Sequence, residues 1–455
     1  MKNISTKYTC IFSFFLLLGL TSCDNALDVD LPSNQLSSES VYATEATAEA
    51  AVNGIYQSMV ADFYYNRVHA LLGQTADELV PKTGIANIYS SNEIPETDGT
   101  INSNWGELYK TIYNANNVIE GLTKSTSINA AKSKRWIAEA KFLRAYSYFY
   151  LTNLWGNVPL VLTTNVDVSA LLPQSSQEAV YAQILLDLTD ASKELPTDYK
   201  NYDQERIRAT KWAAEALLAR INLYLGKWDE ASNHASAVIN ETGTYGIAEL
   251  SESNSPFIAD NKEAILQIPY YNVTYTYEGS SVFTTSGTLL LRKGNALFET
   301  GDARKTNWTI DITDRLGVFL GIAPHKYQNN FGDSPSERST PLRLAELYLI
   351  RAEARVKLND ITGAQQDINA IRNRALLGNT TLTNPNQLLD LIALERQREF
   401  FAENGHRWLD LKRTGKLDET LSVLSDKIWK STDNLYPIPE PALRSNPFLN
   451  QNSGY

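Results

Sequence analysis

Cysteine is almost absent from the 455-residue chain, which contains only Cys10 and Cys23. Cys10 borders an apolar N-terminal stretch, and Cys23 lies just after that stretch. The rest of the chain can therefore form neither a disulfide bond nor a thiolate metal site, and cysteine catalysis is excluded. Stability must come from burial of apolar side chains, which is feasible because 43% of the residues are hydrophobic.

Histidine and basic charge are also sparse. The chain has no His-x-x-x-His spacing, no Gly-x-Ser-x-Gly elbow and no glycine-rich phosphate loop. Lys and Arg number 41 against 52 Asp and Glu, which gives a net charge of −11 without a basic stripe and argues against nucleic acid as a partner. The sequence therefore predicts no cofactor and no metal ion, although a calcium site built from loop carboxylates stays open as an alternative. The four histidines are His69, His234, His325 and His406.

Long hydrophobic runs are missing as well. A membrane-spanning helix needs about 20 apolar residues, and the one pronounced run, Ile11–Leu20, is too short. It follows Lys2 and Lys7 and leads into Thr21-Ser22-Cys23, a pattern typical of a bacterial lipoprotein signal. We predict that residues 1–22 are a signal peptide, that Cys23 is lipidated and that the remainder is soluble. The alternative is an ordinary secretory signal that happens to contain a cysteine.

Helical periodicity is what the chain has in abundance. Trp105–Leu122 carries apolar residues at spacings of three and four, and so does the stretch 135–154, which a Gly and a Pro then end. Both are expected to be helices that face a core. The Trp residues of such helices and turns are assigned to packing, namely Trp105, Trp136, Trp155, Trp212 and Trp228.

A helical hairpin occurs twice. The first has a helix from Trp212 to Leu225, a tight turn at Gly226 and a second helix ending at Ile239. The same shape returns in the stretch 345–375, where small residues again allow two helices to approach closely. Ala352, Leu358, Ala364 and Ile371 take the places of Ala219, Leu225, Ala231 and Val238.

Between these hairpins the helical pattern stops. The stretch 245–339 is rich in Gly, Ser and Thr and contains the strand-like ILQIPYY, so it predicts loops with short strands. A second irregular stretch, 77–104, contains two prolines and two glycines. Loops on a rigid scaffold often carry binding sites, so these two stretches are the candidate functional surface. The tail 431–455 has four prolines and is expected to lie extended along the body.

The C-terminal part also carries a recognisable set of residues. The stretch 393–416 reads ALERQREFFAENGHRWLDLKRTGK, and further signatures are FLRAYSYFYLTNLWGNVPLV at 142–161, RLAELYLIRAEA at 343–354 and the tail LYPIPEPALRSNPFLNQNSGY. Together these resemble the SusD/RagB family. The residues of the first stretch that match the family pattern are Glu395, Arg396, Glu403, Gly405, Arg407, Asp410, Leu411 and Arg413.

The resemblance implies a mostly α fold, with a tetratricopeptide-like hairpin scaffold and an irregular, short-strand ligand-binding region. We expect one domain, 23–455, with the scaffold at about 38–244 and 340–430, the insertion at about 245–339 and the extended tail at 431–455. It implies a lipid-anchored, surface-exposed outer-membrane protein that binds glycans, or occasionally peptides as RagB-type proteins do. Its partner would be a SusC-like TonB-dependent barrel transporter. Asp24, Asp28 and Asp30 fit an acidic export signal, or equally a solvated linker.

An enzyme is the competing class. Glu399 and Glu403 lie four residues apart on one predicted helix and could suggest a paired-carboxylate glycoside hydrolase. Such enzymes need carboxylates that converge from opposite sides of a sugar, whereas these two share a helix with several arginines. The set is therefore predicted to form structural ion pairs, and no catalytic residue is assigned.

Ligand contacts are predicted in the irregular stretches. A glycan site needs exposed aromatic rings surrounded by polar side chains. In ILQIPYYNVTYTYEG, a continued strand would place its alternate tyrosines on one face; the opposing interpretation is packing of the loops onto the scaffold. The candidates are Asn87, Tyr89, Asn92, Glu93, Tyr271, Asn272, Tyr275, Tyr277, Arg304 and Trp308.

Overall fold

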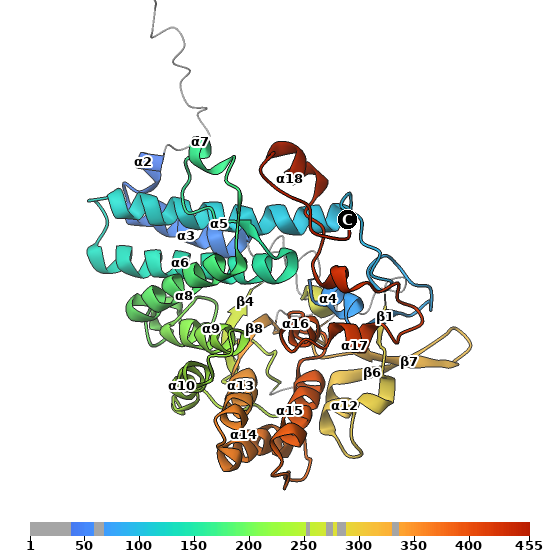
Figure 1. Ribbon diagram of the computed structural model, residues 1–455. Coiled ribbons are helices and arrows are strands. Elements are labelled where there is room, and N and C mark those ends of the chain that lie inside the picture. Colours follow the sequence, from blue (N-terminus) through green and yellow to red (C-terminus); the bar gives the residue numbers. More distant parts are fainter. Residues whose placement is uncertain (1–37, 59–67, 252–254, 270–275, 280–287, 330–335) are drawn as a thin grey trace, which may run out of the picture.

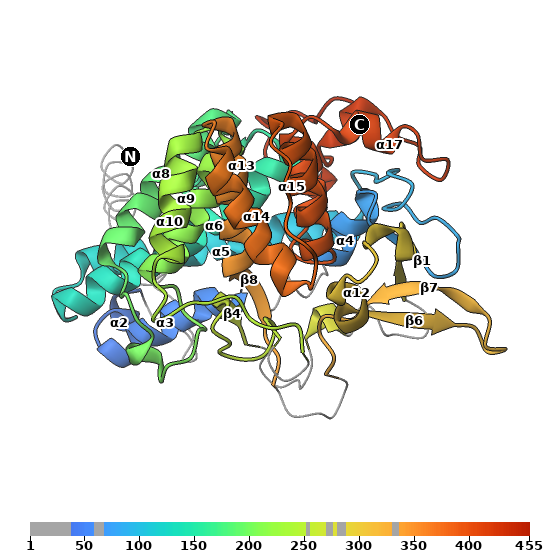
Figure 2. The ribbon, with the colours of Figure 1, turned by 90° about the horizontal axis from the view of Figure 1, so that it is seen from below.

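The computed structural model describes residues 38–58, 68–251, 255–269, 276–279, 288–329 and 336–455. The expected signal peptide and Cys23 lie outside the described residues. Figure 2 shows two layers: long helices occupy one side of the molecule, and the short strands lie on the other side together with α2 and α3. Within the described part of the chain, no helix is long and apolar enough to cross a membrane.

The N-terminal part consists of helices, as the periodicity predicts. Two 26-residue helices, α5 and α6, pack side by side (Figure 1). The predicted stop of α6 is confirmed, because Gly156 follows its last residue with a positive φ of 78°. The irregular stretch expected at 77–104 ends earlier than predicted, because Asp98 caps α5 by accepting a hydrogen bond from the Ile101 backbone. These helices are α2 (Ser38–Val41), α3 (Glu45–Ser58), α4 (Val68–Thr75), α5 (Gly99–Lys124) and α6 (Ala130–Trp155).

Both predicted hairpins are present. The first is formed by α9 and α10 and the second by α13 and α14, and α10 packs against α13. The four alanines that match between the hairpins are completely buried, because a methyl group is all that fits between helices at this distance. The helices of this part are α8 (Gln177–Glu194), α9 (Lys211–Tyr224), α10 (Trp228–Ile239), α13 (Leu344–Lys357), α14 (Ile361–Arg374), α15 (Pro385–Phe400), α16 (His406–Arg413) and α17 (Leu417–Leu421).

The strands of the described residues form four antiparallel pairs, each with two strands. The expected strand in ILQIPYY is confirmed as β4, which pairs with β8 at the foot of α13. The pairs are β1 (Leu79–Pro81) with β5 (Leu289–Leu291), β2 (Val158–Pro159) with β3 (Gln174–Ser175), β4 (Ala264–Ile268) with β8 (Ser339–Arg343), and β6 (Thr309–Thr313) with β7 (Phe319–Pro324). Short helical pieces lie between them: α7 (Val166–Ser169), η3 (Lys200–Tyr202), η5 (Gly294–Leu297) and α12 (Ala303–Trp308).

The proline-rich tail differs from the expectation. It contains a 3-10 turn, η6 (Ser431–Asn434), and a short helix, α18 (Glu440–Ser445). Pro441 lies in the first turn of α18, where a backbone N–H has no helical partner and a proline costs nothing. The prolines therefore position this helix rather than preventing it. The tail still lies against the body, because Trp155 Nε1 donates to the Pro437 carbonyl at 2.9 Å.

Candidate functional site

The two irregular stretches meet in space. Leu79 of β1 lies opposite Leu291 of β5, and the Lys82 backbone donates to the Thr288 carbonyl at 3.0 Å. Segments that are some 200 residues apart in the sequence therefore form one surface, next to the β6–β7 hairpin (Figure 2). This contact supports the hypothesis that the two irregular stretches contribute to one functional surface.

Asn87 is exposed, and its side chain also organises the first loop. Its Oδ1 accepts hydrogen bonds from the backbone of Tyr89 and of Ser90, both at 3.0 Å, and its Nδ2 donates to Gln74 Oε1 at 2.8 Å. The half-buried Tyr89 donates its hydroxyl to Asp98 at 2.9 Å. Burial, together with this carboxylate, raises the pKa of Tyr89 to about 12. The loop is therefore held in one conformation by its own side chains.

Asn92 is buried, whereas Glu93 is exposed. The Asn92 side chain donates to the Thr75 carbonyl at 3.1 Å and accepts from Lys427 Nζ at 2.6 Å. Its backbone has a φ of 65°, a left-handed conformation that asparagine tolerates better than most residues. Asn92 thus has a structural role, and Glu93 is the candidate of this pair that remains accessible.

Arg304 and Trp308 do not offer a surface to a ligand, which corrects the sequence-based assignment. Their side chains are 0% and 1% exposed, respectively. Arg304 forms a two-point ion pair with Asp302, at 2.9 and 2.8 Å, and also contacts Glu395. Trp308 packs against Phe257 and Phe401 in a second apolar cluster. The irregular composition of this stretch gave no sign that it contains a short helix, α12, which packs against the scaffold.

The carboxylates of Glu399 and Glu403 are buried and paired, as predicted, but they do not share a helix as expected, because α15 ends at Phe400. Arg343 donates to Glu399 at 2.5 Å and to Glu403 at 2.8 Å, and Lys326 donates to Glu403 at 2.5 Å. Burial alone would raise the pKa of Glu399, but Arg374, Arg343 and Arg304 hold that pKa far below its usual range. Neither carboxyl can act as a proton donor near neutral pH, because each stays ionised within its arginine contacts.

The tyrosine-rich segment is only partly described. Tyr271, Asn272 and Tyr275 lie outside the described residues, and Tyr277 is half-buried. Tyr277 is helical, so the expected strand does not continue to this position. The cause is local: Thr276 Oγ1 accepts from the Gly279 backbone at 3.1 Å, as an N-cap residue does.

A cavity of about 450 Å³, which was not predicted from the sequence, lies at the C-terminal end of β4. Pro269, at the end of β4, lines it and is followed by the tyrosine-rich stretch. The exposed side chains of Asn53 and Gln57 reach it from α3, and those of Asp203 and Glu205 from the turn after η3. Amides, carboxylates and apolar ring edges meet here, which is the mixture that a hydroxyl-rich ligand needs.

The wall of this cavity is rigid. Arg208 is stacked between the rings of Tyr56 and Tyr202, with its Cζ 4.8 and 5.0 Å from their centroids. All three side chains bond the same buried carboxylate, Glu139 of α6: Arg208 at 2.5 Å, Tyr56 at 3.0 Å and Tyr202 at 2.8 Å. No sequence spacing reveals this group, because its members come from three separate segments: α3, α6 and the connection between α8 and α9.

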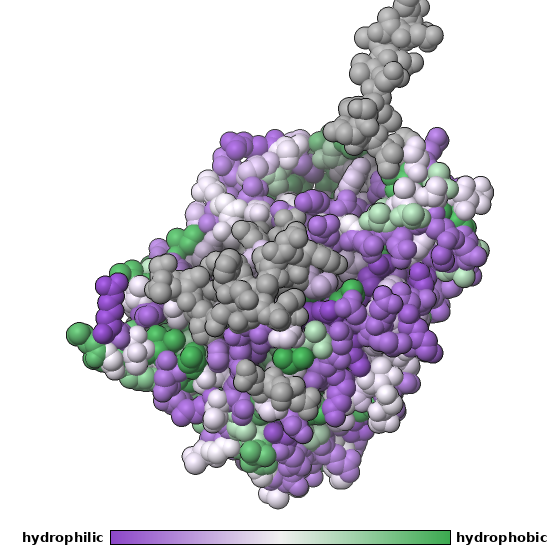
Figure 3. All heavy atoms as spheres, turned by 180° about the vertical axis from the view of Figure 1, so that it is seen from behind, coloured by the Kyte–Doolittle hydropathy of each residue, from purple (hydrophilic) through white to green (hydrophobic). Residues whose placement is uncertain are grey.

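Apolar side chains gather at the tip of the β6–β7 hairpin, which projects from the body (Figure 2) and forms a hydrophobic edge in Figure 3. Leu316 is 89% exposed, and Val318 and Phe319 are more than half exposed. Asp314 fixes this tip by accepting from the Leu316 and Val318 backbones at 2.8 and 2.9 Å.

Across the described ranges, no group of His, Cys, Asp and Glu could hold a metal ion.

Two family profiles match the chain. The profile described as "Starch-binding associating with outer membrane" matches residues 27–223, and the "SusD family" profile matches residues 270–455. Among curated proteins, SusD-like protein P25 of Formosa agariphila is 25% identical, over 97% of this chain and 98% of its own. The starch-binding protein SusD of Bacteroides thetaiotaomicron is 26% identical, over 73% of this chain and 75% of its own.

Solved structures show the same fold. A laminarin-binding SusD-like protein superposes with a TM-score of 0.74 at 25% identity, covering 90% of this chain and 100% of that chain. A SusD superfamily protein from Parabacteroides distasonis gives a TM-score of 0.76 at 21% identity, covering 92% of this chain and 100% of that chain. The expected tetratricopeptide-like, mostly helical fold is thereby confirmed.

Proposed function

Because the chain belongs to the SusD/RagB family, whose members bind ligands without converting them, we propose that it captures oligosaccharides at the outer membrane and passes them to a SusC-like TonB-dependent transporter. The family profile that matches the N-terminal half is named for starch binding and for association with the outer membrane. Two of the similar proteins are named for starch and laminarin. The lipid anchor at Cys23 belongs to the same proposal.

The observation that carries the proposal is the cavity at the end of β4. It combines the Asn53 and Gln57 amides, two carboxylates and a rigid wall of two tyrosines and an arginine. Neutral sugars bind through many hydroxyl hydrogen bonds together with contacts to flat apolar faces. Pro269, which lines the cavity, directly precedes in the chain the tyrosine-rich segment that the sequence singled out; this supports the proposal that both contribute to ligand binding.

Peptides are the second candidate ligand, as in RagB-type proteins. The exposed tip of the β6–β7 hairpin favours this alternative, because Leu316, Val318 and Phe319 suit apolar peptide side chains better than sugars. A panel of oligosaccharides and a panel of short peptides, titrated against the purified protein by calorimetry, would separate the two classes.

The site is tested with two exposed or half-buried positions. Gln57→Ala should weaken oligosaccharide binding several-fold, since a hydrogen bond contributes about 0.5–1.5 kcal/mol. Tyr277→Ala should do the same, since a ring contact contributes about 0.5–1.5 kcal/mol. Tyr455→Ala, which removes a partly exposed ring from the distant C-terminus, is the matched control and should leave affinity unchanged. Unaltered affinity in the Gln57 and Tyr277 variants would place the site elsewhere. Selective binding of peptides would mean that the ligand is a peptide and not an oligosaccharide.

A further inference from the structure

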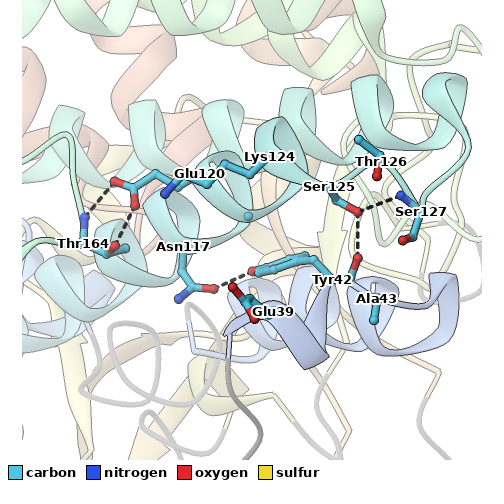
Figure 4. A pocket seen from close by; sticks show the side chains of 11 residues that line it. Glu39, Tyr42, Ala43, Asn117, Glu120, Lys124, Ser125, Thr126, Ser127 and Thr164 are labelled. Carbon is cyan, nitrogen blue, oxygen red and sulfur yellow. Dashed lines mark hydrogen bonds between the residues drawn. The ribbon is translucent and has the colours of Figure 1, made fainter.

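A second cavity of about 450 Å³ lies at the other end of the molecule from the β6–β7 hairpin. It is formed by α2, the C-terminal half of α5, the turn that follows α5 and the loop before α7 (Figure 4). None of the predicted ligand-binding residues lines it. Its volume falls within the usual range for small-molecule sites, about 300–1,000 Å³.

The floor of this cavity is built by Tyr42, which is almost fully buried. Its ring lies flat against Gly121 of α5, where an added Cβ would overlap the ring carbons. Ser125 Oγ donates to the Tyr42 carbonyl at 2.7 Å and accepts from the Ser127 backbone at 3.3 Å. These contacts hold α2 and the turn after α5 in fixed positions on either side of the opening.

The orientation of the Asn117 amide follows from its neighbour. Tyr42 Oη donates to Asn117 Oδ1 at 2.5 Å, so the Nδ2 group must point away from the ring, as Figure 4 shows. Among the described residues, Nδ2 has no hydrogen-bond partner. Asn117 therefore presents two donor hydrogens on the cavity side.

Glu120 supplies the matching acceptor. Its two oxygens accept from Thr164, one from the backbone at 2.9 Å and one from the hydroxyl at 2.7 Å (Figure 4). Burial raises the pKa of Glu120 less than the Thr164 and Thr163 hydrogen bonds lower it, so the carboxylate stays charged. Each oxygen retains a second lone pair that a ligand hydroxyl can use.

An exposed aromatic ring, Tyr113, lies on the same helix as the cavity residues but is not one of the residues that line the cavity. Tyr113 is 46% exposed and lies one helical turn before Asn117, so Tyr113, Asn117, Glu120 and Lys124 follow one face of α5. Burial raises the pKa of Tyr42, and the nearby Tyr113 raises it further.

We propose that this α5 cavity is a second saccharide-binding site, separate from the loop-rich region. Donors and acceptors line the cavity and the exposed Tyr113 ring lies on the same helix face, which matches the alternating hydroxyl and CH surfaces of a neutral sugar. Glu39 and Glu120 outnumber Lys124, which disfavours acidic ligands such as nucleotides. This inference rests on the proposed function only for the ligand class, because the residues of the α5 cavity are different from those of the proposed site.

The test counts bound oligosaccharides. The detergent-solubilised full-length protein is titrated with maltohexaose and with laminarihexaose, and the stoichiometry is measured by calorimetry. Two sites are expected in the unmodified protein and one in the double variant Tyr113→Ala/Asn117→Asp. The aspartate keeps an oxygen for Tyr42 but removes the amide donors. Each single variant should weaken the second site at least three-fold.

Thr123→Ala is the matched control on the same helix, because its exposed hydroxyl bonds only the Ile119 carbonyl of that helix. It should leave both sites unchanged, and thermal melts should show that all variants are folded. A single site that responds to Gln57→Ala but not to Tyr113→Ala overturns the inference and leaves the proposed function intact. Failure of the unmodified protein to bind either oligosaccharide counts against both.

Discussion

The ammonium group of Lys427 donates to the Asn92 side-chain oxygen at 2.6 Å, although 335 residues of sequence separate the two. The same nitrogen also donates to the carbonyls of Gln74, Thr75 and Ser90, at 2.9, 3.1 and 3.1 Å. The segment after α17 thus clamps the first candidate loop onto α4. Burial lowers the pKa of Lys427 to about 7, with Arg292 acting in the same direction.

Lys427→Met should loosen this loop. Four oxygen acceptors would lose a buried donor, and leaving such groups unsatisfied costs about 1–3 kcal/mol. We expect a lower melting temperature and faster amide hydrogen exchange at residues 87–92. Lys416→Met, which removes only an exposed pair with Glu419, should change neither quantity. Unchanged exchange in the Lys427 variant would show that the loop holds itself in place through Asn87.

Glu399→Gln should destabilise the protein strongly. The buried carboxylate neutralises Arg343 and Arg374, and removing one partner of a buried ion pair typically costs about 3–5 kcal/mol. Chemical denaturation should show this loss. Neither the unmodified protein nor the variant should release reducing sugar from polysaccharides, whereas activity that is lost in Glu399→Gln would restore the hydrolase hypothesis.

Glu78 should make stability depend on pH. Burial raises its pKa to about 7, from a usual value near 4.5, despite a hydrogen bond from the Ala402 backbone. The folded state therefore holds this proton more tightly than the unfolded state, and stability falls as pH rises from about 4.5 to about 7. Glu78→Gln, which stays neutral, should gain up to about 3 kcal/mol relative to the unmodified protein at pH 8 and nothing at pH 4. Parallel denaturation curves of the two proteins at both pH values measure this difference, and equal gains would contradict the prediction.

Gly121→Ala should disturb the docking of α2. The new methyl group would overlap the Tyr42 ring, and overpacking costs about 1–3 kcal/mol. Gly106→Ala on the same helix meets no atom within 4 Å and should stabilise the helix by about 0.5–1 kcal/mol. Thermal melts of the two variants should shift in opposite directions, and parallel shifts would indicate that Tyr42 can move aside freely.

Cys23→Ala should abolish membrane retention. Acylation of a cysteine adds chains that contribute about 0.8 kcal/mol per buried CH₂, and the described residues contain no spanning helix. In a detergent phase separation, the unmodified protein should partition into the detergent phase and the variant into the aqueous phase. Equal partitioning of both would refute the anchor.

The sequence could predict the hairpins because their pattern is local. The alanines at 219, 231, 352 and 364 recur at helical spacing, and the need for small side chains between close helices follows from geometry alone. The pairing of the α15 carboxylates was predictable, but their partners were not, because Arg304, Arg343 and Arg374 come from other elements. Trp308 was not predictable either, because a tryptophan in a polar, irregular stretch looks exposed until Phe257 and Phe401 are known to cover it.

The sequence by itself determined the family and the helical scaffold, because each rests on residues that are neighbours in the chain. Only the tertiary structure decided which polar and aromatic groups meet. The Tyr56–Arg208–Tyr202 stack and the α5 cavity draw residues from segments far apart. Their contacts depend on the packing of whole helices, and that packing sums many small apolar contributions, which no local pattern records.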